Sequence, residues 1–276
     1  MHEEFELLTL ESNGIRLRAA VEGEGPLVVM VHGWPELWYS WRHQIKAIAS
    51  AGYRVVAPDM RGYGGSDKPT DLEAYDMVNL MGDILGIIDS FGQEKAILIG
   101  HDWGSAVGWY LASKNSDQIL TWTALSVPHL DSFLKAIKED EEQKKKSQYI
   151  SLFRKPILPE LYFKIFGYKY LKNIWSESLD NEKKLYLEVF KQKNALKATL
   201  NWYRANFNNE NQEIGDIYIP TLIIYGKNDM AVGEKSVDGS EKYLMGNYKI
   251  EKLDSGHWLI QESFDLVSEM ILDHIN

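Results

Sequence analysis

An acidic residue between two glycines, directly after an apolar stretch, is the most informative feature of the sequence. Residues 97–99 are apolar, residues 100–104 read Gly-His-Asp-Trp-Gly, and a helical stretch follows at 106–112. A strand that turns sharply into a helix at such a pattern holds its central residue, here Asp102, in a strained conformation. The alternative is that Asp102 only caps the helix, which aspartate does well. The pattern therefore indicates a candidate nucleophile and leaves that alternative open.

The side chain at position 102 also indicates a class of substrate. A serine that attacked a saturated carbon would leave an ether, which is a dead end. A carboxylate leaves an alkyl ester instead, and water activated by a base can hydrolyse this ester at the Asp102 carbonyl. Aspartate as the nucleophile therefore predicts substrates with an electrophilic saturated carbon, which means epoxides or alkyl halides.

An acid and a histidine follow in the chain order that such a nucleophile requires. Asp229 lies just after a predicted strand at 220–226, and His257 lies just after one at 248–253. His257, oriented by Asp229, would activate the hydrolytic water. Taken singly, Asp229 also fits a turn former and His257 a packed loop histidine. Their order and their positions at strand ends favour a triad with Asp102.

A fourth loop is expected to supply backbone donors. The residues after a predicted strand at 27–31 read His32-Gly33-Trp34-Pro35. The Trp34 amide would join the Trp103 amide in facing the oxyanion that forms on the Asp102 ester. Pro35 has no N–H to donate and would shape the loop. The alternative is an ordinary helix start with a proline in its first turn.

The elements that must position these residues follow from hydrophobic patterning. Short apolar runs bounded by turn signals are typical of strands buried on both faces of a parallel sheet, and they occupy 27–31, 53–57, 96–99, 220–226 and 248–253. A helical stripe that packs on the sheet is formed by Met77, Met81, Ile84, Ile88 and Phe91. Residues 7–20, around Asn13-Gly14, predict an antiparallel hairpin at one edge. Together they predict an α/β sheet with right-handed crossovers.

One long segment does not follow this pattern. Residues 130–216 are helical in composition, and 208–212 within them read as a polar return loop. This predicts a core of residues 1–129 and 217–276, interrupted by a helical cap at 130–216. The insertion is far longer than an ordinary connection, and on an enzyme scaffold such insertions are usually lids.

Composition excludes several classes of protein. The chain has 276 residues, no cysteine and a net charge of −10, with 40 acidic against 30 basic residues. One domain with an insertion fits this length, and the charge argues against a nucleic-acid binder. Disulfide frameworks and cysteine-ligated zinc are excluded. Residues 1–5 carry no export signal, and no membrane span is expected, so a cytoplasmic location is the default expectation.

The motifs together resemble the epoxide hydrolases of the α/β-hydrolase fold. The matching segments are 32–44, 58–69, 100–106, 126–129, 225–229 and 255–258, which cover nearly the whole core. The resemblance implies a mostly parallel eight-stranded sheet flanked by helices, with an inserted helical cap. It also implies Asp102 as nucleophile, His257 as base and Asp229 as the acid that orients it.

Two tyrosines of the cap complete the implied site. The resemblance selects Tyr203, a close match within Leu-Asn-Trp-Tyr-Arg, and Tyr149, a looser match. They would hold the epoxide oxygen and protonate it as the ring opens to a vicinal diol. The expected partners are a small apolar epoxide and water, with no metal or organic cofactor, in a monomer or homodimer.

Two other readings remain open. Haloalkane dehalogenases resemble this chain at the same nucleophile turn, and Trp103 suits their halide site. Many of them, however, carry an Asn halide donor where this chain has Trp34, and their pattern lacks the motif around Tyr203. The other reading is a hydrolase-like ligand-binding or sensing protein with little turnover. Structural roles are expected for six polar residues near the motifs: Asp59, Arg61, Asp67, His101, Ser105 and Ser126.

Overall fold

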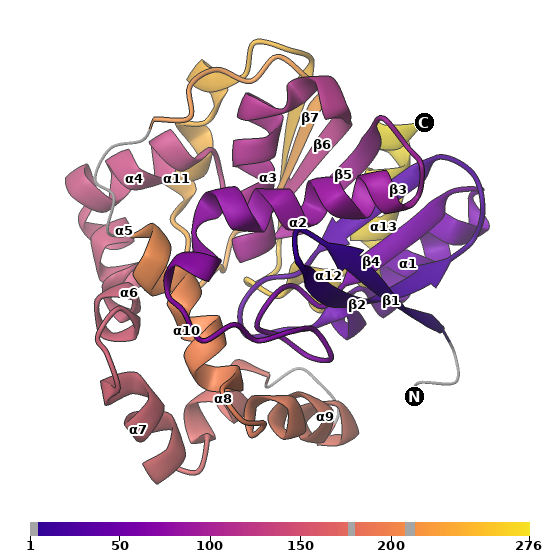
Figure 1. Ribbon diagram of the computed structural model, residues 1–276. Helices are drawn as coiled ribbons and strands as arrows, with labels where there is room; N and C mark the ends of the chain where they lie inside the picture. The colour runs from indigo at the N-terminus through magenta and orange to yellow at the C-terminus, as the bar shows by residue number, and fades with distance from the viewer. Residues whose placement is uncertain (1–4, 176–179, 208–212) are drawn as a thin grey trace.

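A single eight-stranded sheet organises the molecule (Figure 1). The structure is a computed structural model that describes residues 5–175, 180–207 and 213–276. The strands are β1 (Glu6–Ser12), β2 (Ile15–Glu22), β3 (Leu27–Val31), β4 (Arg54–Pro58), β5 (Ala96–His101), β6 (Ile119–Leu125), β7 (Thr221–Gly226) and β8 (Tyr248–Leu253). Their order in the sheet is β1-β2-β4-β3-β5-β6-β7-β8. β2 runs antiparallel to both of its neighbours and the other pairs are parallel, as expected.

The predicted strands are present, and one further strand was not predicted. The edge hairpin is confirmed: β1 pairs with β2 around Asn13 and Gly14, whose φ angles are 48° and 76°. β6 was missed because Thr121 and Thr123 interrupt its apolar run. It lies between β5 and β7, so the sheet would be incomplete without it.

Helices cover both sides of the sheet. In Figure 1, α2 (Met77–Ser90) and α3 (Trp103–Lys114) cross in front of the strands, while α13 (Phe264–Ile275) lies behind them and packs against α1 (Arg42–Ser50). The buried face of α2 is formed by Leu80, Ile84, Ile87 and Ile88. The predicted stripe was therefore right at its centre, but three of its members are only partly buried: Met77, Met81 and Phe91. The remaining elements of the core are η1 (Trp38–Trp41), η2 (Glu73–Tyr75), η3 (Ser116–Gln118), α11 (Glu234–Asp238), η4 (Glu241–Tyr243) and α12 (Leu259–Glu262).

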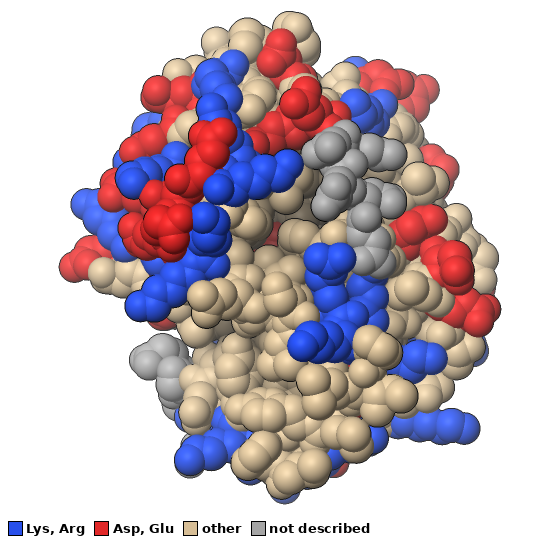
Figure 2. All heavy atoms as spheres, turned by 90° about the vertical axis from the view of Figure 1, so that its left-hand side faces the viewer, with Lys and Arg blue, Asp and Glu red and all other residues tan. Residues whose placement is uncertain are grey.

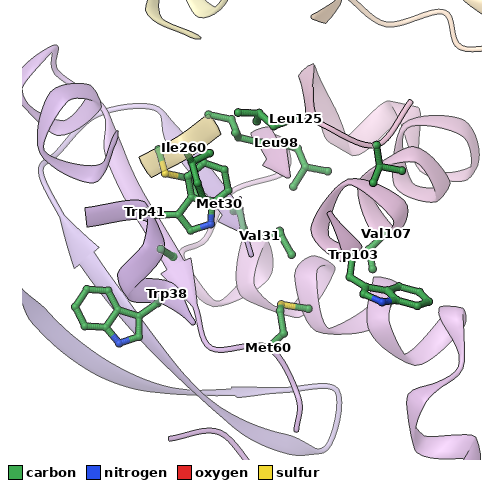
Figure 3. Packing of buried hydrophobic residues seen from close by; sticks show 14 of the residues in the cluster. Met30, Val31, Trp38, Trp41, Met60, Leu98, Trp103, Val107, Leu125 and Ile260 are labelled. Atoms are coloured by element: carbon green, nitrogen blue, oxygen red, sulfur yellow. The ribbon is translucent and has the colours of Figure 1, made fainter. Parts of the chain in front are cut away.

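The central strands are buried on both faces and form the main hydrophobic core. All five residues of β3 are buried, and Figure 3 shows Met30 and Val31 packed with residues of neighbouring elements such as Trp41 and Leu98. Burying one large aliphatic side chain contributes about 1.5–3 kcal/mol. The core thus gives the strand ends fixed positions, from which the loops with polar residues extend.

Between β6 and β7, every regular element described from residue 130 to 206 is a helix, while residues 213–220 contain no helix and form one isolated bridge at Ile217. The helices are α4 (Leu130–Glu139), α5 (Glu141–Lys146), α6 (Gln148–Phe153), α7 (Leu158–Ile165), α8 (Lys169–Ile174), α9 (Asp180–Phe190) and α10 (Ala195–Asn206). In Figure 1 they lie to the left of the sheet and below it. The polar return loop predicted at 208–212 lies outside the described residues. Among the described residues, no helix is long and apolar enough to cross a membrane.

Candidate active site

Asp102 lies at the turn between β5 and α3, in a backbone conformation that few non-glycine residues adopt. Its φ is 51° and its ψ is −117°. A Cβ atom at Gly100 would meet the carbonyl oxygen of Gly104 at 2.5 Å, and one at Gly104 would overlap the carbonyl group of Val31. Only glycine therefore lets β3, β5 and α3 approach so closely. The Asp102 side chain makes no capping hydrogen bond to α3, so helix capping does not explain its position.

The loop after β3 presents a backbone donor to the Asp102 carboxylate. The Trp34 amide donates a hydrogen bond to Oδ1 of Asp102 at 2.7 Å. A Cβ atom at Gly33 would overlap the Asp102 side chain, so glycine is required there as well. The Trp34–Pro35 peptide bond is cis. Trp103 is the first residue of α3, and no hydrogen bond joins its amide to Asp102 in the described part of the chain.

His32 keeps this loop in place rather than facing a ligand. Its Nε2 accepts a hydrogen bond from the Met60 amide at 3.1 Å, so its Nδ1 carries the proton and donates to the carbonyl of Gly33 at 2.8 Å. Burial lowers the pKa of His32, which favours this neutral form. The side chain is fully enclosed, with 1% of its surface exposed.

The structure brings His257 and Asp229 to Asp102. His257 Nδ1 lies 2.8 Å from Oδ2 of Asp229, and its Nε2 lies 3.6 Å from Oδ2 of Asp102. The other Asp229 oxygen accepts hydrogen bonds from the amides of Ala231 and Val232 at 2.7 and 2.9 Å. Asp229 follows β7 and His257 follows β8, so loops after β3, β5, β7 and β8 all contribute at the carboxyl edge of the sheet. Ligand sites of open α/β sheets lie at this edge.

The charges of these three residues depend on one another. Burial alone would lower the pKa of His257, but the carboxylates of Asp229 and Asp102 outweigh it and raise this pKa to about 10. Burial would likewise raise the pKa of Asp229, but the interaction with His257 and the two loop amides holds it below its usual value. The raised pKa of His257 favours the imidazolium form of this side chain in the unliganded site.

Two tyrosines of the helices between β6 and β7 line the same cavities as the Asp102 carboxylate. Tyr203 of α10 is buried, and Tyr149 of α6 is half-buried; their ring centroids are 6.2 Å apart. The Tyr203 ring also packs edge-on against Trp34 and Trp103, at 6.0 and 5.0 Å. Burial of both hydroxyls, reinforced by the nearby negative charge of Asp102, raises the pKa of each tyrosine well above its usual value. Both phenols therefore remain protonated and able to donate a hydrogen bond.

Two cavities meet at these residues. Their volumes are about 500 Å³ and about 560 Å³, and both are lined by Asp102, Tyr149, Tyr203 and His257. Apolar or aromatic walls of the first come from Trp34, Tyr170, Ile174, Met230, Ala231 and Trp258, and charged residues at it are Glu142, Lys145 and Lys146. Further walls of the second include Val127, Leu130, Phe133, Ile150 and Phe207. The space around the carboxylate is thus large and mostly apolar, with a few polar groups that converge on one point.

A second set of contacts fixes His257 from behind, and sequence reasoning did not identify it as a group. The backbone carbonyl of His257 lies 2.9 Å from the Ser126 hydroxyl, which donates to it, and 2.8 Å from His101 Nε2. Nδ1 of His101 lies 3.4 Å from the buried carboxylate of Glu36, which also accepts a hydrogen bond from Gln261. Ser126, His101 and Glu36 each lie within or beside a recognised motif, and this adjacency is the signal that could have found them.

The other residues for which structural roles were expected hold the surrounding loops. Arg61 pairs with Asp83 through two contacts of 2.6 and 2.5 Å, and Asp59 accepts a hydrogen bond from Arg18 at 2.8 Å. Asp67 pairs with Arg16 at the surface. The Ser105 hydroxyl bonds to the carbonyl of Gly100 at 2.7 Å. Among the described residues, no three His, Asp or Glu side chains are grouped so that they could hold a metal ion.

Comparison with known proteins gives consistent matches. Residues 26–264 match the alpha/beta hydrolase fold family. The AB hydrolase superfamily protein YfhM of Bacillus subtilis is 36% identical over 96% of both chains, and epoxide hydrolase A of Mycobacterium tuberculosis is 31% identical, also over 96% of both. Among solved structures, an epoxide hydrolase of Bacillus megaterium with a bound inhibitor has a TM-score of 0.90, with 25% identity over 98% of this chain and 100% of that one. An epoxide hydrolase of Vigna radiata has a TM-score of 0.86, with 30% identity over 100% of this chain and 99% of that one.

Proposed function

The chain belongs to the alpha/beta hydrolase fold family, and from this premise we propose that it is an epoxide hydrolase in which Asp102 is alkylated by the substrate. One observation carries the proposal. Oδ1 of Asp102 is held by an amide, while its Oδ2 lies beside His257 in an apolar cavity lined by two tyrosines. A carboxylate so placed is suited to attack on a saturated carbon, and phenols beside it are suited to a developing alkoxide.

In the first step, Oδ2 of Asp102 attacks a ring carbon of the epoxide. The carbon–oxygen bond of the ring breaks, its electron pair moves to the oxygen, and Tyr149 and Tyr203 donate hydrogen bonds to that oxygen. One of the two phenols gives it a proton. Oδ1 becomes the carbonyl oxygen of the new ester, already in contact with the Trp34 amide at 2.7 Å. No oxyanion donor then has to move before the next step.

In the second step, water attacks the ester carbonyl. Esterification removes the negative charge of Asp102, so the pKa of His257 falls and its imidazolium returns a proton to the phenolate left by the first step. The neutral imidazole then accepts a proton from water. The tetrahedral oxyanion on Oδ1 is stabilised by the Trp34 amide, and the Trp103 amide at the start of α3 is the second expected donor. The bond between Cγ and the alkylated oxygen then breaks, the proton of the added hydroxyl passes to the leaving oxygen, and a vicinal diol is released as Asp102 returns to a carboxylate. The reaction consumes one epoxide and one water and needs no cofactor.

The cap belongs to this proposal. We assign residues 1–129 and 217–276 to the catalytic core and residues 130–216 to a cap that supplies Tyr149 and Tyr203. The apolar lining of both cavities supports an apolar epoxide as the substrate.

The experiment compares an aryl epoxide with a bromoalkane of similar size, using wild type, Asp102→Asn and His257→Gln. We expect diol from the wild type, none from Asp102→Asn, and in His257→Gln an adduct on Asp102 whose added mass equals that of the epoxide. Bromide release without diol formation would instead favour a dehalogenase. Tight epoxide binding with no turnover by wild type would favour a binding protein, and an active wild type whose His257→Gln variant gave no adduct would contradict the covalent step.

A further inference from the structure

The outer side of α7 exposes a run of large apolar residues. Ile165 is 73% exposed and Leu161 is 48% exposed. We call this surface the α7 face, and it consists of Ile157, Leu158, Leu161, Tyr162, Ile165 and Phe166. Contiguous apolar patches on a folded protein commonly mark a surface that binds something.

The inner side of the same helix is also apolar, but it is covered. Phe163 is buried, with its ring 5.8 Å from Phe153, 5.6 Å from Tyr170 and 6.1 Å from Trp34. Besides the charged Glu160 and Lys164, α7 thus carries apolar residues on both its inner and its outer side. In this chain only one side of α7 is covered, so the other side has no apolar partner among the described residues.

In the turn that precedes α7, Ile157 has a strained backbone conformation and an exposed side chain. Ile157 has φ 67° and ψ −41°, and the Leu158 amide donates a hydrogen bond to the carbonyl of Pro156 at 2.6 Å. A turn of this type is rare, and positive φ is least favourable for a β-branched residue. Ile157 is nevertheless 67% exposed, so burial of its side chain does not offset the strain. Such strain is typical of functional positions.

Basic residues surround the α7 face, although the whole chain has a net charge of −10. Four exposed lysines that make no ion pair with any described residue are Lys155, Lys164, Lys169 and Lys172. The one acidic residue between positions 154 and 174 is Glu160, which pairs with Arg204 at 2.8 Å and is therefore neutralised. In Figure 2 the lower part of the molecule, at the height of α7 in Figure 1, is mostly tan with blue side chains at its margins.

We propose that the α7 face docks on the surface of an anionic lipid bilayer. Its aliphatic and aromatic side chains would enter the boundary between head groups and acyl chains, while the lysines meet lipid phosphates. Contact between two copies through the same face is disfavoured, because a two-fold axis would bring the lysines of both copies together. The contact is peripheral, since no described helix can cross a membrane.

This inference goes beyond the proposed function and has a consequence for it. α7 is the outermost layer over the aromatic cluster of Phe163 and Trp34, and Trp34 lines the first cavity. Tyr170 and Ile174 of the next helix line the same cavity. A docked α7 face would therefore hold a bilayer, which concentrates apolar molecules, one helix away from the cavity wall.

The test is cosedimentation of the full chain with vesicles of phosphatidylcholine alone or mixed with phosphatidylglycerol. The variants are Leu161→Ser/Ile165→Ser and Lys164→Glu/Lys169→Glu. The matched controls are Val78→Ser on α2, where the side chain is 77% exposed, and Lys95→Glu before β5. Circular dichroism and thermal unfolding show that each variant is folded, and sedimentation velocity reports the oligomeric state.

We expect the wild type and both controls to bind the mixed vesicles, less so at raised ionic strength, and to bind phosphatidylcholine alone more weakly. Each α7 variant should bind the mixed vesicles at least about tenfold more weakly than the wild type, because two inserted side chains or two lysine contacts are lost. A folded wild type that fails to bind mixed vesicles would overturn the proposal. So would α7 variants that bind as the wild type does, or a dimer that these variants abolish, which would identify the face as a contact between copies.

Discussion

The two oxygens of Asp102 have different surroundings, and this difference assigns them different roles. Oδ1 accepts the Trp34 amide, whereas Oδ2 lies 3.6 Å from His257 Nε2 and has no amide donor among the described residues. Oδ2, which no described backbone amide holds, is the oxygen assigned to the attack, and the amide-bound Oδ1 is already placed as an ester carbonyl. The arrangement thus prepares both steps of the proposed reaction before a substrate binds.

The charge of His257 provides a prediction at this scale. Its pKa of about 10 depends on two carboxylates, one of which becomes neutral when the proposed ester forms. Asp102→Asn mimics that neutral state, so the pKa of His257 should be lower in this variant by at least about one unit. NMR titration of the imidazole, assigned by its absence in His257→Gln, measures both values. An unchanged titration in Asp102→Asn would contradict the dependence on Asp102.

Stability should follow the same titration. The folded-state pKa of His257 lies above the unfolded value of about 6.5, so its contribution to stability is complete below that pH and is lost as the pH rises through about 10. Between these limits the unfolding free energy of the wild type should fall by up to about 1.4 kcal/mol per pH unit. Urea titrations at several pH values should show a shallower fall in Asp102→Asn.

Single residues differ in how far the sequence alone could identify them. Asp102, Asp229 and His257 are recognisable because each follows a strand in a fixed order, and the fold does bring them together. Tyr149 and Tyr203 could be selected only by family resemblance, since the cap contains several tyrosines and helix packing decides which of them reach the carboxylate. Tyr170 and Ile174 carry no local signal at all, yet both line the first cavity.

At the scale of elements, close packing at the nucleophile turn depends on glycines with different neighbours. A Cβ atom at Gly104 would overlap the backbone of Val31, which cannot move without displacing β3. A Cβ atom at Gly108, one turn further along α3, would overlap the Trp122 side chain of β6 instead. The first contact lies beside Asp102, and the second lies deeper in the core.

We expect Gly104→Ala and Gly108→Ala each to lower the unfolding free energy by about 1–3 kcal/mol or more, because overpacking outweighs the better helix propensity of alanine. Gly104→Ala should also reduce diol formation at least tenfold, since it displaces the turn that carries Asp102. Gly108→Ala should retain most of the activity of its folded fraction. Urea unfolding and kcat measured on both variants check these expectations. Equal losses of activity in the two variants would show that the turn carrying Asp102 is no more sensitive to overpacking than the core near Trp122.

Helices and strands could be predicted where the hydrophobic residues follow a single clear pattern along the sequence. β3, β5 and β7 are continuous apolar runs, so their bounds differ little from those expected. β6 alternates threonines with apolar residues and was missed, although its Thr123 is buried like its neighbours. On α2 the apolar arc is wide enough that two adjacent stripes fit the sequence, and only contact with the sheet decides that Leu80 and Ile87 face inward.

At the scale of the whole molecule, the loop that carries Asp229 is held from two sides. Its core side is fixed by β7, which it follows. Its cap side is fixed by α5, where Lys146 donates to the carbonyls of Asp229 and Val232 at 2.6 and 3.0 Å. Gln143 of the same helix donates to the carbonyl of Ala231 at 2.9 Å and accepts from the Gly233 amide at 2.7 Å. The proposed cap therefore does more than border the cavity, because it bonds to the loop that carries Asp229, the proposed triad acid.

Gln143→Ala tests this coupling between cap and core. Gln143 is fully buried, so its removal leaves the Gly233 amide without a partner and should lower the unfolding free energy by about 1–3 kcal/mol. Diol formation should fall as well, because Asp229 would no longer hold His257 firmly. Lys144→Ala is the matched control on the same helix, where an exposed side chain pairs with Glu141, and its effect on stability should stay within about 0.5 kcal/mol. If Gln143→Ala lost stability but kept the kcat of the control, the cap would stabilise the loop without positioning the triad.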